Sequence, residues 1–215
     1  MVYSYYTYYF VLLLSCLCGL LYFKSNTFNV KLLSLLLIVT FLTESIARPF
    51  LSYLHLSNNN PIYNCYILIE SLFYSFFYYI TIQSIITKRL IIAVQIIFLA
   101  FWIWTSFFIF HISEWNSYAA IAESFVAVIL SAIYYYKLFT SPFLISLKKV
   151  PEFWIATGMI LYYSCSMPYL GMLDFLTKHY PVLSNNLLIL LNALNIIMYL
   201  LFAYAFLCKT ITKRY

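Results

Sequence analysis

Apolar residues occur along the chain in long runs, and polar residues gather in the short breaks between them. Seven runs come near the roughly 20 residues that an α-helix needs to cross a hydrocarbon core about 30 Å thick. These runs cover residues 5–23, 31–47, 62–86, 90–110, 117–138, 153–173 and 183–207. The breaks are rich in residues that are typical of turns. The pattern predicts an all-α polytopic membrane protein, a seven-transmembrane helix bundle that forms one domain over residues 1–215.

The composition excludes a water-soluble domain. Hydrophobic residues make up 65% of the 215 residues and charged residues only 8%, and the mean hydropathy is +0.92. A soluble surface would have too few polar groups to hydrate it. The lipid bilayer is therefore the first predicted partner. The net charge of +6 does not indicate nucleic acid, because the basic residues lie in certain connectors and in the C-terminal tail.

The distribution of Lys and Arg predicts the orientation of the helices. The second, fourth and sixth connectors contain only Arg48 and Lys178. The other connectors with their flanks, and the C-terminal tail, carry the remaining basic residues, which are Lys24, Lys31, Lys88, Arg89, Lys137, Lys148, Lys149, Lys209, Lys213 and Arg214. Basic residues are enriched on the cytoplasmic side of membrane proteins. We therefore expect a multi-pass protein of the cell inner (cytoplasmic) membrane, with the N-terminus outside and the C-terminus in the cytoplasm.

The third apolar run carries a carboxyl group, Glu70, about a third of the way along. A charge near the middle of a spanning helix costs about 3 kcal/mol on insertion scales. Helical spacing puts a set of polar residues on the same face of this run, namely Tyr63, Tyr66, Glu70, Tyr74, Tyr78 and Thr81. Residues three and four apart share a face of a helix, so this polar stripe is expected to point at other helices rather than at lipid.

Polar side chains of several runs fall in the outer half of the oriented bundle. The seventh run adds Asn192 and Asn195 on one stripe, and the fifth adds Glu123. Acids outnumber bases there; the acids are Glu44, Glu70, Glu114, Glu123 and Asp174, and the bases are Arg48 and Lys178. A cavity in this half is expected to favour protons, a metal cation or an organic amine over anions. Since dehydration favours the neutral form of a carboxyl group, Glu70 and Glu123 can also act as neutral hydrogen-bond donors.

These observations predict one ligand-binding site. Its residues are Glu70, Glu123, Asn192, Asn195, Tyr66 and Tyr74. Structural interpretations stay open beside it. Glu44 precedes Arg48 by one helical turn, which favours a local ion pair. Intramembrane carboxyl and amide groups also join helices by hydrogen bonds without binding anything, and an aromatic stripe packs against its neighbours wherever no cavity faces it.

The sequence contains no enzyme signature, and we predict no catalytic residue, no metal and no cofactor. His55, His111 and His179 lie in or beside three different outer connectors. Three imidazoles on one side can bind zinc, but exposed loop histidines are the commoner case. The five cysteines have no metal-ligand spacing, and three glycines in 215 residues are too few for a phosphate-binding loop.

Two stretches carry a resemblance to known proteins. Residues 63–70 (YNCYILIE) and 152–164 (EFWIATGMILYYS) are similar to those of small uncharacterised bacterial seven-helix membrane proteins. Such proteins are similar in layout to the membrane part of some sensor histidine kinases. The resemblance implies the same seven-helix layout and a sensor-like role, and it supplies no catalytic residues.

The favoured hypothesis is a membrane-embedded sensor-like or accessory protein that binds a small cationic or neutral ligand in an outer-half polar pocket. It is expected to signal through a cytoplasmic or membrane protein partner, at Lys148 and Lys149 or at the tail from Lys209. The alternative is a proton- or cation-coupled transporter or channel, which requires a polar path past Gln83 and Gln95 to the cytoplasm. A membrane-embedded hydrolase ranks third, because it requires the loop histidines to converge.

Overall fold

The computed structural model describes residues 2–53, 58–111, 113–140 and 147–212, without the side chains of 2–4, 48–53, 174 and 209–212. The protein is all-α, with 89% of the described residues in helices. The helices are α1 (Val2–Leu21), α2 (Phe28–Tyr53), α3 (Asn60–Thr81), α4 (Ile85–Trp104), α5 (Ser117–Phe139), α6 (Pro151–Gly171), α7 (Leu173–His179) and α8 (Pro181–Thr212). A π-helical turn, η1 (Thr105–Ile109), continues α4, and a 3₁₀ turn, η2 (Leu147–Lys149), precedes α6.

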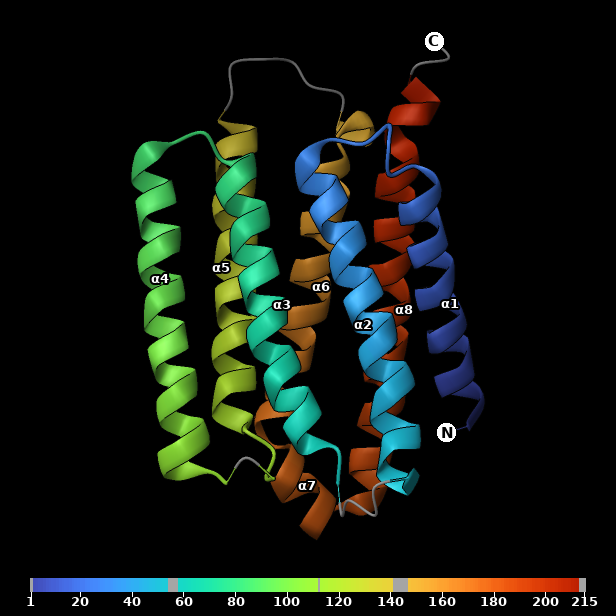
Figure 1. Cartoon of the computed structure of the whole chain (residues 1–215), viewed down its shortest axis with the longest axis vertical. Helices are drawn as coiled ribbons and strands as arrows, with labels where there is room; N and C mark the ends of the chain where they lie inside the picture. The colour runs from blue at the N-terminus through green and yellow to red at the C-terminus, as the bar shows by residue number, and fades with distance from the viewer. Residues whose placement is uncertain (1, 54–57, 112, 141–146, 213–215) are drawn as a thin grey trace.

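The long helices stand side by side and alternate in direction, so the two chain ends lie at opposite ends of the bundle (Figure 1). Six of them form a closed ring in the order α1, α2, α3, α5, α6 and α8, with α8 packed again on α1. Helix α4 lies outside this ring and packs against α3 and α5. The short helix α7 covers the end of the bundle at which α1 begins (Figure 1).

Four helical segments of the described chain are long and apolar enough to cross a membrane, and they are Phe28–Ala47, Ile85–Ile109, Ser117–Phe139 and Pro181–Cys208. A shorter apolar helix covers Tyr5–Leu21. Helices α3 and α6 are not among these candidates, and we attribute this to the tyrosines and serines they carry on faces turned toward other helices. Membrane character is thus supported by four helices, and the predicted count of seven spans goes beyond them.

The surface of α4 has the character expected of a lipid-facing helix. Large apolar side chains are exposed along its length, including Ile86 at 74%, Ile97 at 67% and Phe108 of the adjoining η1 at 79%. A contiguous exposed apolar surface is unusual on a soluble monomer. Because α4 is the helix outside the ring, its outer face has no protein to cover it, which agrees with a bilayer as the surrounding solvent.

Most helix boundaries agree with the sequence pattern to within a few residues, although α2 continues to Tyr53 and α8 to Thr212. Two of the breaks between the predicted runs also differ. The residues expected to form the sixth connector include a helix, α7. The third run was expected to continue to residue 86, but α3 ends at Thr81 and α4 starts at Ile85. The side chain of Ser84 accepts a hydrogen bond from the Thr87 backbone N–H and caps the start of α4, as serine commonly does.

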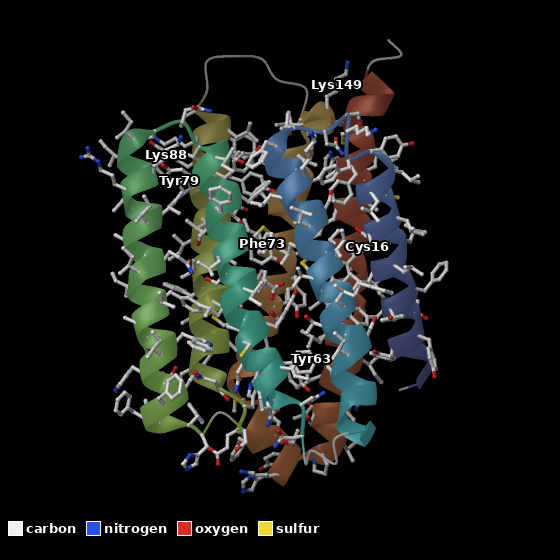
Figure 2. The ribbon with its side chains drawn as sticks, viewed as in Figure 1. Cys16, Tyr63, Phe73, Tyr79, Lys88 and Lys149 are labelled. Atoms are coloured by element: carbon white, nitrogen blue, oxygen red, sulfur yellow. The ribbon has the colours of Figure 1, made fainter. Side chains whose placement is uncertain are left out.

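The two ends of the bundle differ in charge. The basic end carries the α1–α2 and α3–α4 connectors and η2, with Lys24, Lys88, Arg89, Lys148 and Lys149; Figure 2 shows Lys88 and Lys149 at this end. The opposite end, called the cavity end below, carries the α2–α3 and η1–α5 connectors and α7.

An apolar core fills the ring toward the basic end. The largest fully buried side chains of this core come from α1, α2, α3, α6 and α8, and they include Leu12, Leu37, Phe77, Tyr78, Met159, Phe202 and Phe206. Gly158 lets α6 approach α8 closely, since a Cβ there would lie 3.2 Å from the Phe202 ring and 3.3 Å from Met198.

Candidate functional site

A cavity of about 730 Å³ lies inside the ring. Every helix of the ring contributes to its wall, whereas α4 does not. The polar lining residues are Tyr5, Tyr6, Tyr8, Thr40, Glu44, Asn59, Asn60, Tyr63, Tyr66, Glu70, Glu123, Tyr162, Tyr163, Asn192, Asn195 and Tyr199. The apolar lining residues are Ile67, Trp115, Ala120, Leu170, Leu173, Leu188, Ile189, Leu191 and Met198. A cavity of this size is in the range of small-molecule sites.

Glu70 on α3 is held by the tyrosines one turn before and one turn after it. The hydroxyls of Tyr66 and Tyr74 both donate to Glu70 Oε1, at 3.1 and 2.9 Å. Residues four apart on a helix lie on one face, so the stripe predicted from the sequence places these donors directly. Tyr66 also hydrogen-bonds Thr40 of α2 at 2.7 Å. Tyr74 is 3% exposed and does not line the cavity itself. Its contribution to the site is the hydrogen bond that it donates to Glu70.

Glu123 on α5 lies beside Glu70 of the neighbouring helix α3, and both line the cavity. The two carboxyl groups are close enough to hydrogen-bond each other. Small residues let α5 approach its neighbours, since Ala120 and Ala127 are each 1% exposed. Glu123 is 4% exposed and lines the cavity. Its Oε1 atom has no hydrogen-bond partner among the described residues, which is costly for a buried polar atom.

A second unsatisfied group lies on α6 in the same wall. Tyr163 is 2% exposed, and its hydroxyl has no partner in hydrogen-bond geometry within the described part of the chain. Its ring packs edge-on against Tyr74, with centroids 5.6 Å apart. The hydroxyl lies near Glu70 and Tyr74 without completing a hydrogen bond to either.

Glu44 on α2 belongs to the wall of the cavity. Tyr8 of α1 donates to its Oε1 at 3.1 Å, and Tyr63 of α3 donates to its Oε2 at 3.2 Å. The ion pair with Arg48 that the sequence favoured lies outside the described side chains. These two hydroxyl donors show that Glu44 joins three helices of the ring.

The two asparagines predicted on the last helix also line the cavity. Asn192 and Asn195 lie on α8, and Asn195 lies close to the Tyr162 hydroxyl of α6. One turn further, the Tyr199 ring lies 5.9 Å from the Tyr8 ring. Five of the six predicted residues thus line one cavity, and the sixth, Tyr74, hydrogen-bonds Glu70.

The ionisable side chains of the cavity lining are all acids or tyrosines. Its described lining contains three carboxyl groups and no lysine, arginine or histidine. Eight tyrosines surround them, and tyrosine offers both a hydroxyl partner and a ring face that attracts cations. This arrangement suits a cation or a neutral hydrogen-bonding molecule, and it disfavours an anion.

The sequence reasoning did not identify several tyrosines of the wall. Tyr8, Tyr162 and Tyr163 come from the first and sixth apolar runs, in which aromatic residues are too frequent to give a periodic signal. Tyr162 and Tyr163 are neighbours in sequence and yet both line the cavity. Only the position of α6 between α5 and α8 reveals their role.

A different polar network lies beside the cavity, where α3, α4 and α5 meet. The Asn116 side chain caps α5 by accepting from the Ala119 N–H at 3.0 Å. It also donates to the hydroxyls of Thr105 and Ser106, at 2.9 Å each. Its backbone N–H donates to Asn64 Oδ1 at 3.2 Å. Asn116 is fully buried, so this network joins helices and offers nothing to a ligand.

Gln95 does not extend the cavity toward the basic end. It lies on α4, outside the ring, and accepts hydrogen bonds from Ser71 and Ser75 of α3 at 3.2 and 2.7 Å. Gln83 lies in the connector between α3 and α4. The polar path that the transport hypothesis expects through these two glutamines is therefore not formed inside the ring.

The described residues contain no group of three or more His, Cys, Asp or Glu that could hold a metal ion. His111 and His179 are exposed, and His179 stacks on Phe175 at 4.6 Å between ring centroids. His55 lies outside the described residues. The five cysteines are free thiols. The hydrolase hypothesis, which requires all three histidines to converge, therefore gains no support from the described residues.

Searches against protein-family models, curated proteins and solved structures find no match to this chain. The resemblance to small bacterial seven-helix proteins therefore stays a prediction.

Proposed function

We propose that the chain is a seven-pass membrane protein, N-terminus outside, that binds a small cationic or neutral ligand in the ring cavity and acts as a sensor-like or accessory protein. One observation carries the proposal: a cavity of about 730 Å³ holds Glu44, Glu70 and Glu123 with no basic residue among its described lining. Buried ionisable residues in membrane helices are rare and commonly functional.

The apolar core favours binding over passage. Between the cavity and the basic end, the ring is filled by side chains such as Phe77, Met159 and Phe202, which are at most 2% exposed. A solute that reached Glu70 from the cavity end would meet this core next. This arrangement favours a pocket that a ligand enters from the cavity end, which suits recognition of a ligand from outside the cell.

The helices of the ring connect the cavity to the basic end, so a structural change on ligand binding would be transmitted along them. Helix α8 carries Asn192 and Asn195 at the cavity and continues to η2, where the Cys208 thiol donates to the Lys148 carbonyl at 3.4 Å. Lys148 and Lys149 are exposed there. A small shift of α8 against α6 would move these lysines, and we propose this surface as the contact for a protein partner.

Thermal stability in the presence of candidate ligands tests the binding proposal. We expect organic amines to raise the Tm of the purified protein in nanodiscs, and neutral alcohols of the same size to raise it less, because binding to the native state stabilises it. Glu70→Gln should abolish the shift, and Glu114→Gln, at an exposed acid of the same end, should keep it. An identical shift in wild type and Glu70→Gln would contradict the proposal.

A further inference from the structure

Hydrogen-bond donors are distributed unequally between the two facing carboxyl groups. Glu70 Oε1 accepts two tyrosine hydroxyls, from Tyr66 and Tyr74. Glu123 Oε1 accepts none from the described residues, although it is buried. Donors stabilise an ionised carboxylate. Of the two groups, Glu70 is therefore the one equipped to carry a negative charge.

Two carboxylates in contact in an apolar site do not both ionise readily, because like charges repel and neither is hydrated. The titratable groups that face the pair are Tyr66 and Tyr74 of α3, Tyr162 and Tyr163 of α6, and Tyr199 of α8. Tyr8 of α1 and Glu44 of α2 lie further along the same cavity wall. None of these neighbours carries a positive charge at neutral pH. A single proton on Glu123, donated to Glu70, would satisfy both groups in the empty cavity.

The rest of the cavity wall indicates the shape of the molecule that displaces this proton. Apolar side chains from the end of α6, from α7 and from the start of α8 line one side, namely Leu170, Leu173, Leu188, Ile189 and Leu191. The carboxyl pair and Tyr163 line another part of the wall. A ligand with one charged end and one apolar end matches both surfaces.

We propose that the ligand is an organic ammonium ion with at least one N–H and an apolar body, and that it exchanges for a proton held by Glu123. The inference rests on the proposed function and deepens it. The Glu123 O–H bond breaks, its proton leaves to water, and the ammonium N–H groups donate to Glu123 Oε1. The pair changes from one negative charge to two while the ligand adds one positive charge, so the charge of the site is unchanged.

Calorimetry with 2-phenylethylamine as the probe tests the exchange. Titrations of the full chain in nanodiscs, in two buffers that differ in ionisation enthalpy, report the protons released per ligand bound. We expect about one proton, and an affinity that rises about tenfold per pH unit while the pair keeps its proton. Phenyltrimethylammonium, which has a charge but no N–H, should bind at least tenfold more weakly.

Two variants make the calorimetry specific. Glu123→Gln has no proton to release, so proton release should fall to zero in the binding that remains. Glu114→Gln should behave as wild type. Amine binding with no proton release by wild type overturns the exchange and leaves the proposed function intact. No binding of any amine or of its neutral analogue by wild type instead overturns the proposed function.

Chemical labelling tests the position of the proton without any ligand. Dicyclohexylcarbodiimide enters apolar sites and adds to protonated carboxyl groups. We expect peptide mass spectrometry to find the adduct on Glu123, and Glu123→Gln to remove it. An adduct on Glu70 with Glu123 unmodified, or on neither residue, would overturn the assignment.

Discussion

Two groups of polar side chains lie near each other at the cavity end, and they differ in how completely they are satisfied. Around Asn116, the side-chain amide and the backbone N–H are used between α3, η1 and α5. Around Glu123, a buried carboxyl oxygen and the Tyr163 hydroxyl have no partner among the described residues. The first group closes a helix junction, and the second group faces a cavity of about 730 Å³.

The two groups show how polar residues that hold an apolar bundle together can be told apart from polar residues that face a ligand. Burial does not separate the two groups, because Asn116 is fully buried and Glu123 is 4% exposed. The two groups differ in that only the Glu123 group has buried polar atoms without a hydrogen-bond partner next to the cavity. A network that satisfies itself contributes to stability, whereas an acceptor without a donor lowers stability unless a ligand supplies the missing hydrogen bond. The comparison therefore predicts opposite responses to substitution.

The largest effect is expected at the satisfied junction. Asn116→Ala removes the cap of α5 and leaves the hydroxyls of Thr105 and Ser106 without their common partner. We expect the free energy of unfolding to fall by about 3 kcal/mol, from a lost cap and unsatisfied buried groups. Reversible unfolding in mixed micelles measures it. Asn60→Ala, near the surface of the same end, is the control with a small effect, and equal losses in both variants would contradict the distinction.

A smaller effect of the opposite sign is expected at the carboxyl pair. Glu123→Met replaces a buried, partly unsatisfied carboxyl group with an apolar side chain of similar size. We expect the free energy of unfolding to rise by about 1 kcal/mol, because such replacements are commonly neutral or stabilising. Amine binding should be lost in the same variant. A fall in stability would show that Glu123 holds the ring together and would remove the contrast with Asn116.

The central part of the site could be predicted because α3 is regular. Tyr66, Glu70 and Tyr74 are spaced by four residues, and that spacing alone puts the two hydroxyls on the carboxyl group. Glu123 stood out as an ionisable residue in an apolar run. Asn192 was placed by its stripe on the last helix, which indeed forms part of the wall.

The remaining part depends on which helices are neighbours, and a helical period contains no such information. Nothing in the sequence pattern shows that α8 closes the ring on α1 or that α4 stays outside it. The role of Tyr8 and Tyr163 follows from that order. The partners of Asn116 across η1 are equally invisible, since Thr105 and Asn116 are eleven residues apart and only the turn between α4 and α5 brings them together.

The smallest expected effect separates two tyrosines of one helix. Tyr74 donates to Glu70, whereas Tyr78, one turn further, hydrogen-bonds Ser131 at 2.6 Å in the apolar core. Tyr74→Phe should weaken amine binding about fivefold, because Glu70 loses one of the two tyrosine hydroxyls that hold its carboxyl group in place at the cavity, and ordering a side chain on binding costs about 1 kcal/mol. Tyr78→Phe should lower stability by a similar free energy and leave affinity unchanged.

Calorimetric titration of both variants with 2-phenylethylamine, together with their unfolding curves, measures the two quantities side by side. Both substitutions remove one hydroxyl from α3 and keep the aromatic side chain. General damage to the helix would therefore affect affinity equally in the two proteins. Weaker binding in Tyr78→Phe than in Tyr74→Phe would mean that the ligand reaches the apolar core, and the boundary between the site and the core would then lie closer to the basic end than the cavity does.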